Sequence, residues 1–439
     1  MARSRSIIPF MLVGAVATGL GLWVWHRDEA APSPAPASEA ATPQDRSPTK
    51  TGLSGAGPLS PLAPEPDWAK LNRWQSAITR EDFLDAMENV YTVSGSWREW
   101  FHLGENDVLV ETGVPNERFR LRFANPGLER ENARPWRGAS EMPPAPADQP
   151  LKDVKIAIDP GHIGGSWAKI EERWFQLGND LPVQEGDMTL LVARLLVPRL
   201  EALGAEVSLV RETNEPVTPS RPADFMDDKV PDATRRLAEQ LFYRTAEIRA
   251  RAEKVNTLRP DLVLCLHFNA EPWGDPAKPA LVDQTHFHLI LNGAYTAEEL
   301  ANADQRHDMM QRIVSHTHRE EAALGETVAA AFVEATRMPP FLYEPNSTRA
   351  VNVNGNPYLW ARNLLANRVY QAPVVFLEPY LMNGREDYQR IQAGDYEGMR
   401  EVAGKPRPSI FREYADAVTE GLNRHYRKFR PIAALPAEE

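Results

Sequence analysis

Two histidines and two glutamates stand where predicted strands end or a predicted helix begins, and their side chains could act together. His162 follows one apolar run, His267 ends another, Glu185 precedes an amphipathic stretch, and Glu378 closes the segment PVVFLE at residues 373–378. Two imidazoles and one carboxylate suit Zn²⁺, and three protein ligands leave a fourth position for water. A glutamate near such water could serve as general base and then as general acid. The set indicates a hydrolytic zinc site rather than a structural one.

Taken one at a time, these residues have simpler explanations. A lone histidine at the end of a strand, such as His162 or His267, is more often a polar residue at the rim of a sheet than a metal ligand. Glu185 could be an ordinary carboxylate at a helix start, where the helix dipole favours negative charge. Burial of the Glu378 carboxylate costs free energy unless another group compensates its charge. The joint placement of the four residues is what favours the zinc site.

The elements that must position these side chains alternate between strands and helices along the second half of the chain. Helices are predicted at residues 187–203, 244–255 and 320–336, and strands at residues 154–159, 206–211, 261–267, 285–291 and 373–378. This alternation predicts an α/β domain with a mostly parallel sheet flanked by helices. Because the carboxyl ends of parallel strands meet at one edge of such a sheet, ligands from different strands can converge there.

Three segments are predicted between the N-terminus and this domain, which we assign to residues 153–430. Residues 30–66 are rich in proline and small residues, and we expect a disordered linker because they bury too little apolar surface to offset the entropy of ordering. Residues 67–138 are predicted to form a small α+β accessory module, in which Thr79 caps a helix. A second proline-rich linker covers residues 139–152. Four of the five tryptophans in this module could form a ligand platform but are better explained as its core: Trp68, Trp74, Trp97 and Trp100.

The N-terminus has the pattern of a membrane anchor. Arg3 and Arg5 precede a run without charge at residues 6–25, and roughly 20 apolar residues of helix are enough to cross a bilayer. The arginines should remain cytoplasmic, which sends the rest of the chain outward. We interpret residues 1–29 as an uncleaved transmembrane anchor; a cleaved signal peptide followed by secretion is the alternative.

Composition excludes some classes of protein. The formal net charge of -12 argues against a nucleic-acid binder, which would present a basic face or stripe. Cys265 is the single cysteine, so the chain can form neither an intrachain disulfide nor an all-cysteine metal site.

Three ordered motifs resemble those of the zinc-dependent N-acetylmuramoyl-L-alanine amidases of the Amidase_3 family. IAIDPGHIGG at residues 156–165 resembles the opening strand and first zinc histidine of that family. DLVLCLHFNA at residues 261–270, which follows Arg211, Arg221 and Arg251, is similar to the segment of the second zinc histidine. VVFLEPYLMNGRED at residues 374–387 resembles the strand with the catalytic glutamate and the asparagine turn behind it. The resemblance covers residues 153–423, over half of the chain.

The resemblance implies that His162, Glu185 and His267 bind zinc and that Glu378 is the catalytic carboxylate. It also implies that the chain cleaves the amide bond between N-acetylmuramic acid and L-alanine in peptidoglycan, during cell-wall remodelling or separation of daughter cells. With the predicted anchor, the catalytic domain would lie in the periplasm, tethered to the inner membrane. The resemblance leaves open whether an activator protein is a further partner.

Two other functions fit the same sequence. The chain could be a catalytically inactive module that binds the cell wall or regulates a partner, or it could be a zinc hydrolase of another amide or peptide bond. Several departures from the family pattern keep these alternatives open. Glu171 and Glu172 rival Glu185 as a ligand, and Pro379-Tyr380 replaces the usual glycine-aromatic pair. Residues 222–243 and 292–318 look like insertions that could form a lid. His286 and His288 share one face of a predicted strand, where sheet packing is the simpler explanation and a ligand role the alternative.

Overall fold

The computed structural model describes residues 57–130, 134–226 and 231–431. The predicted anchor at residues 1–29 and most of the predicted linker at residues 30–66 lie outside these described residues. Within the described part of the chain, the helices lack the combination of length and apolar composition that crossing a membrane requires.

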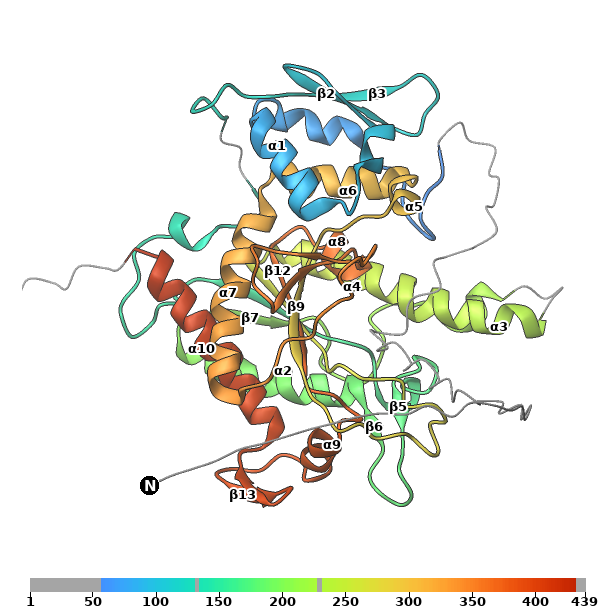
Figure 1. Ribbon diagram of the computed structural model, residues 1–439, viewed down its shortest axis with the longest axis vertical. Helices are drawn as coiled ribbons and strands as arrows, with labels where there is room; N and C mark the ends of the chain where they lie inside the picture. Colours follow the sequence, from blue (N-terminus) through green and yellow to red (C-terminus); the bar gives the residue numbers. More distant parts are fainter. Residues whose placement is uncertain (1–56, 131–133, 227–230, 432–439) are drawn as a thin grey trace, which may run out of the picture. The chain divides into compact units, whose positions relative to one another are not determined.

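A seven-stranded mixed sheet forms the centre of the α/β domain (Figure 1), in the order β10-β11-β9-β12-β8-β4-β7. Its strands are β4 (Lys155–Pro160), β7 (Glu206–Leu209), β8 (Leu262–Leu266), β9 (Phe287–Leu291), β10 (Val351–Asn352), β11 (Leu359–Ala361) and β12 (Val374–Pro379). Strands β12, β8, β4 and β7 are parallel to one another, and β9 pairs antiparallel with β12. The predicted α/β domain with a mostly parallel sheet is confirmed, and the reversed direction of β9 is a feature that the strand pattern did not predict.

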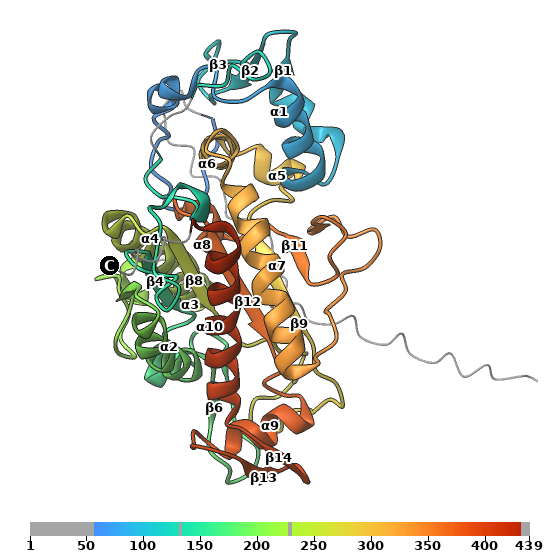
Figure 2. The same cartoon turned by 90° about the vertical axis from the view of Figure 1, so that its left-hand side faces the viewer.

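Helices cover both faces of this sheet because its central strands are apolar on both sides. On one face, α2 (Glu185–Ala202), α7 (Thr317–Thr336) and α10 (Ile410–Phe429) share a hydrophobic cluster with the strands. Figure 2 shows α7 and α10 running side by side, and the two helices are in extensive contact. On the other face, α4 (Glu247–Leu258) and α8 (Leu365–Val369) pack against a second cluster, which contains Cys265, Ile290 and Phe376.

The described residues before this domain form helical turns and a three-stranded antiparallel sheet. They comprise η1 (Trp68–Trp74), α1 (Arg80–Ala86), η2 (Met87–Tyr91), η3 (Gly95–Glu99), β1 (Phe101–Leu103), β2 (Asp107–Glu111), β3 (Arg118–Arg122) and η4 (Ala139–Glu141). The hydroxyl oxygen of Thr79 accepts the N–H of Asp82 at 3.0 Å, which confirms the predicted helix cap. Trp68, Trp74 and Trp97 are buried, and Trp100 packs against the same cluster, as their interpretation as core residues predicts.

The remaining elements are short or lie in loops. A hairpin of β5 (Trp174–Phe175) and β6 (Val183–Gln184) follows η5 (Gly165–Trp167) and leads directly into α2. The segments interpreted as insertions contain η6 (Pro222–Phe225), α3 (Pro231–Gln240) and η7 (Leu241–Ala246), and α5 (Ala297–Leu300) and α6 (Ala303–Val314). Near the end of the chain lie α9 (Arg385–Gln392), β13 (Arg400–Val402) and β14 (Lys405–Arg407).

Candidate metal and catalytic centre

The turn after β4 presents His162 to the edge of the sheet. His162 has a φ of 58°, a left-handed conformation that costs free energy in a residue other than glycine and that the surrounding structure must maintain. Gly161 allows the close approach of the next strand, because a Cβ atom at this position would lie 2.4 Å from the ring of His267. The N–H of Gly161 donates to the carbonyl of Leu266 at 2.8 Å, which fixes the turn against the end of β8.

Glu185 lies between the two histidines. It is the first residue of α2, where the helix dipole favours a carboxylate, and it is 1% exposed. Its Oε2 lies 3.1 Å from Nε2 of His162, and its Oε1 lies 3.0 Å from Nδ1 of His267. Oε1 also accepts the backbone N–H of Phe268 at 3.1 Å. Both carboxylate oxygens therefore face an imidazole nitrogen.

His267 follows β8 and is held by its neighbours on the sheet. Its ring stacks on Phe376 of β12 with centroids 4.4 Å apart, and it meets the ring of His162 edge to face at 5.1 Å. One ligand atom from each of His162, Glu185 and His267 can be chosen so that all three lie within 4.8 Å of one another. The three side chains that the sequence singled out as metal ligands are therefore brought together.

The electrostatics of this group suit a cation. Burial raises the pKa of Glu185, but the neighbouring His162, His267 and Arg173 outweigh burial and lower the pKa to about 2. The side chain is thus a carboxylate at neutral pH. Nε2 of His162 is buried and makes no hydrogen bond within the described residues, although a carboxylate oxygen lies 3.1 Å away. An imidazole nitrogen and a carboxylate oxygen that face each other without a hydrogen bond fit a shared metal ion, and the donor set is one that zinc prefers.

The two glutamates that rival Glu185 in the sequence lie elsewhere. Glu171 is 2% exposed and accepts the N–H groups of Ile163 and Gly164, and its Oε1 lies 3.6 Å from Nδ1 of His162, on the side of the ring away from Glu185. Burial raises the pKa of Glu171, but the neighbouring His162 and the backbone N–H groups of Gly164 and Ile163 lower it below the ordinary value. Glu172 instead forms ion pairs with arginines of α3 and η7. Neither belongs to the three-residue group.

Glu378 lies at the end of β12, beside His267. Leu377 is in register with Leu266 of β8, and the N–H of His267 donates to the carbonyl of Leu377 at 3.1 Å. Phe376 and Cys265 share one hydrophobic cluster, and because side chains alternate along a strand, Glu378 and His267 continue that same face of the sheet. Glu378 is 3% exposed. A buried carboxylate next to a candidate metal ligand is well placed to exchange a proton at the centre.

His288 of β9 is the cross-strand partner of Glu378, and His286 lies two residues before it. Phe341 packs on both rings with centroids 4.8 Å apart. Burial lowers the pKa of His286 to about 4 and that of His288 well below its ordinary value, so both rings are neutral at pH 7. Among the described residues they join no third ligand in a metal group, and their surroundings fit sheet packing.

Three arginines that precede His267 in the sequence donate to backbone carbonyls; Arg211 and Arg251 are buried, whereas Arg221 is exposed. Arg251, 1% exposed, forms ion pairs with Asp159 and Glu247, and it donates to the carbonyl of His162 at 2.8 Å. Arg211 donates to backbone carbonyls that include those of Pro160, Gly161 and Gly186, and Arg221 donates to those of Thr218, Pro219 and Ser220. Arg211 and Arg251 thereby fix the backbone that carries the candidate ligands, whereas Arg221 stabilises its own loop.

Arg173 is a residue at the centre that sequence reasoning missed. Its Nε lies 3.2 Å from Oε2 of Glu185. The contact depends on the β5–β6 hairpin, whose two-residue strands lack the alternating pattern by which strands are recognised in a sequence. The arginine itself carries no motif that could have identified it.

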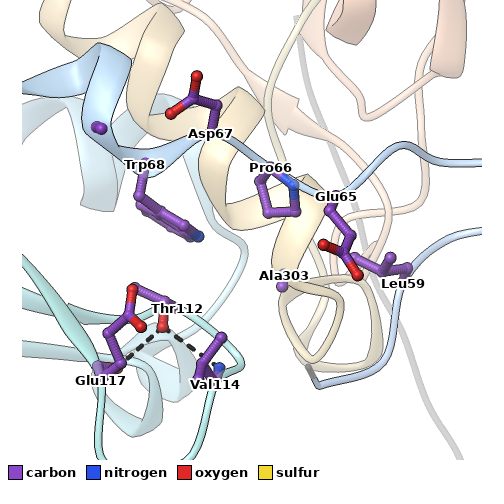
Figure 3. Close-up of a pocket in the computed structure, with 10 residues that line it drawn as sticks. Leu59, Glu65, Pro66, Asp67, Trp68, Thr112, Val114, Glu117 and Ala303 are labelled. Carbon is purple, nitrogen blue, oxygen red and sulfur yellow. Dashed lines mark hydrogen bonds between the residues drawn. The ribbon is translucent and has the colours of Figure 1, made fainter. Parts of the chain in front are cut away.

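A pocket of about 280 Å³ lies apart from this centre, between the N-terminal elements and the start of α6 (Figure 3). Trp68 points into it, and Glu65, Glu117 and Ala303 lie around it. None of the four predicted site residues lines this pocket.

One protein-family model and several solved structures are similar to this chain. Residues 156–401, over half of the chain, match a family model described as N-acetylmuramoyl-L-alanine amidase. The search of curated proteins finds no match. Among solved structures, the N-acetylmuramyl-L-alanine amidase Ami1 from Mycobacterium smegmatis is similar at 16% identity over 63% of this chain and 99% of that chain, with a TM-score of 0.36. The CwlD amidase from Clostridioides difficile, solved with the GerS lipoprotein, is similar at 12% identity over 63% of this chain and 100% of that chain, with a TM-score of 0.37. The amidase AmiC2 of Nostoc punctiforme is similar at 16% identity over 63% of this chain and 96% of that chain, with a TM-score of 0.34.

Proposed function

The chain belongs to the Amidase_3 family of N-acetylmuramoyl-L-alanine amidases, which act on peptidoglycan, and we propose that it cleaves the bond between N-acetylmuramic acid and L-alanine with a zinc ion held by His162, Glu185 and His267. The observation that carries this proposal is the convergence of two imidazoles and one buried carboxylate at the strand edge, within the matched segment. When bound, zinc supplies Lewis acidity toward the scissile carbonyl and lowers the pKa of water.

The residues of the chain perform the remaining tasks. Glu378 takes a proton from the attacking water and delivers it to the departing amide nitrogen, which is general base catalysis followed by general acid catalysis. His162 and His267 would hold the metal through imidazole nitrogens. The position of Glu378 next to His267, on the same face of the sheet, supports this role.

The family places the chain in the cell envelope. We propose that residues 1–29 anchor the chain in the inner membrane, with the catalytic domain in the periplasm. The alternative is that residues 1–29 are a signal peptide, which is cleaved so that the rest of the chain is secreted. The proposed organisation continues with a linker at residues 30–66, an accessory module at residues 67–138, a linker at residues 139–152 and the catalytic domain at residues 153–430. A tether of this kind would let the domain reach the wall from the membrane.

The test is the zinc content of the full-length chain, measured by elemental analysis beside His162→Ala and His267→Ala. About one zinc per chain, lost in both variants, is expected for a site with three protein ligands. Digestion of purified peptidoglycan should then expose new L-alanine amino groups while the glycan strands stay intact. A wild-type chain that binds no zinc, or that binds zinc but exposes no such amino groups, would refute the proposal and favour an inactive wall-binding module or a hydrolase of another bond.

A further inference from the structure

Asp187 joins the turn that carries His162 to the helix that begins with Glu185. It is the third residue of α2, and its Oδ2 accepts the N–H of Gly165 at 2.7 Å. Gly165 lies three residues after His162, and Asp187 lies two residues after Glu185. One carboxylate oxygen therefore links the two backbone segments whose candidate ligand side chains face each other.

The two segments can approach closely because glycines stand where they meet. A Cβ atom at Gly186 would lie 2.3 Å from the backbone nitrogen of Gly164, and a Cβ atom at Gly164 would lie 2.6 Å from Oδ2 of Asp187. Gly164 also has a φ of 79°, which other residues adopt only at a cost in free energy. The sequence thus has no side chains at the point where Asp187 makes its bond.

The other carboxylate oxygen of Asp187 binds a third segment. Its Oδ1 accepts a hydrogen bond from the side-chain amide of Asn214, after β7, at 2.5 Å. Because a carboxylate only accepts hydrogen bonds, the amide nitrogen of Asn214 faces Asp187 and the amide oxygen faces away. That oxygen accepts from Nη1 of Arg211 at 3.4 Å, and Arg211 also donates to the carbonyls of Gly161 and Gly186. Asp187 is therefore part of a network that joins β4, α2 and β7 at their ends.

The turn needs such support because His162 has a left-handed φ, which the surrounding structure must maintain. Two side chains of α2 hold the turn on either side of His162. The hydroxyl of Thr189 donates to the carbonyl of Gly161 at 2.7 Å, and Asp187 accepts the N–H of Gly165. Because both contacts come from the helix that begins with Glu185, they relate the position of one candidate ligand to that of the other.

We propose that Asp187 is a positioning residue, which sets the separation of His162 and Glu185 by holding the turn of the first against the helix of the second. Asp187 acts through these two ligands. The inference rests on the proposed function, because it needs a zinc site made by His162, Glu185 and His267. Mutation of a group that orients metal ligands typically lowers metal affinity or activity by about 10- to 100-fold.

The first experiment measures zinc affinity in the full-length chain by competition with a fluorescent chelator. Asp187→Ala removes both hydrogen bonds and should weaken zinc binding by about 10- to 100-fold. At saturating zinc, kcat on soluble muramoyl-peptide fragments should fall by a similar factor, while KM stays within ~3-fold of the wild type. Glu201→Gln is the matched control, because Glu201 is exposed near the other end of the same helix. It should behave like the wild type.

Exchanging the two side chains of the Asp187–Asn214 pair separates this contact from general stability. Asp187→Asn places two amides against each other, and Asn214→Asp places two carboxylates against each other, so each single variant should bind zinc more weakly. The double variant restores a donor and an acceptor with their roles exchanged, and the amide oxygen at position 187 can still accept the N–H of Gly165. Because residues in contact are energetically coupled, the double variant should recover zinc affinity to within ~3-fold of the wild type.

Hydrogen exchange tests the contact in the zinc-free chain. Peptides that contain Gly165 should lose protection in Asp187→Ala and keep it in the double variant, when exchange is followed by mass spectrometry. Peptides from the buried strand β8 should exchange alike in all variants, because local opening of one turn leaves the core of the sheet closed.

The inference is overturned if Asp187→Ala binds zinc within ~3-fold of the wild type, if the double variant recovers none of the affinity lost in the single variants, or if β8 loses protection together with Gly165. Failure of the proposed function is a different result, namely a wild-type chain that binds no zinc or cleaves no muramoyl-alanine bond. The wild-type measurements therefore test the function, and the comparison of the Asp187 and Asn214 variants with the wild type tests the inference.

Discussion

Nδ1 of His162 faces Oε1 of Glu171 at 3.6 Å, so a buried carboxylate stands behind the imidazole whose other nitrogen points at Glu185. A carboxylate in this position selects the tautomer of a metal-binding histidine and fixes the orientation of its ring. Glu171 is itself fixed, because it accepts the N–H groups of Ile163 and Gly164 at 2.8 and 3.0 Å. We therefore expect Glu171 to act on the proposed zinc centre without being one of its ligands.

Glu171→Gln should weaken zinc binding by about 10- to 100-fold, as is usual when the partner of a metal-binding histidine is removed. Competition with a fluorescent zinc chelator would measure the affinity. Glu172→Gln is the matched control, since Glu172 pairs with Arg236 and Arg244 and should leave zinc affinity unchanged. Equal zinc affinities for the two variants would contradict the role of Glu171.

Arg251 should be among the residues that contribute most to stability. It is 1% exposed, and its loss would leave Asp159 and Glu247 buried without their ionic partner. Breaking a buried pair by removing one partner costs about 3–5 kcal/mol, so Arg251→Gln should lower the free energy of unfolding by that amount. Urea unfolding followed by circular dichroism would measure it. Arg194→Gln, an exposed arginine that donates only to the carbonyl of Glu212 in this structure, should cost well under ~1 kcal/mol.

The positions of His162, His267 and Glu378 could be predicted because each follows an apolar run long enough to be a buried strand. A polar side chain at the end of such a run lies at the edge of the sheet, because the strand itself ends there. Glu185 stands at the start of a predicted helix, and its choice over Glu171 and Glu172 depends on the resemblance to the family. Strand periodicity therefore accounts for the placement of His162, His267 and Glu378 at the edge of the sheet.

Other features depend on tertiary contacts that periodicity does not contain. Glu171 lies behind His162, whereas Glu172, whose φ is 59°, pairs with arginines of α3 and η7. The antiparallel direction of β9 places His288 opposite Glu378, yet a strand has the same alternating pattern in either direction. Arg173 reaches Glu185 only because two very short strands pair in register.

Asp387 should make stability depend on pH. Burial raises its pKa to about 6 from an ordinary value of 3.8, despite hydrogen bonds from Thr285 and Leu381. The folded state thus binds the proton more tightly than the unfolded state, so this contribution to stability is complete below about pH 4 and is lost as the pH rises through about 6.

The measurement for Asp387 is urea unfolding of the wild type and Asp387→Asn over this range. The free energy of unfolding of the wild type, relative to the variant, should fall by up to about 3 kcal/mol from pH 4 to pH 7, because each unit of pKa shift is worth 1.36 kcal/mol. A difference that stays constant with pH would show that the carboxyl group titrates alike in both states.

Glu378→Gln should separate metal binding from catalysis. The substitution keeps the shape of the side chain but removes its ability to take a proton, so kcat should fall by about 10²–10⁴-fold while zinc stays bound. Elemental analysis and release of L-alanine amino groups from peptidoglycan would measure the two properties on the same sample. Glu413→Gln is the control, because this carboxylate accepts hydrogen bonds from Tyr380 and Arg390 and is not next to a candidate metal ligand. Hydrolysis by Glu378→Gln at the wild-type rate would mean that another group moves the proton, and His288, its neutral cross-strand partner, would be the next side chain to substitute.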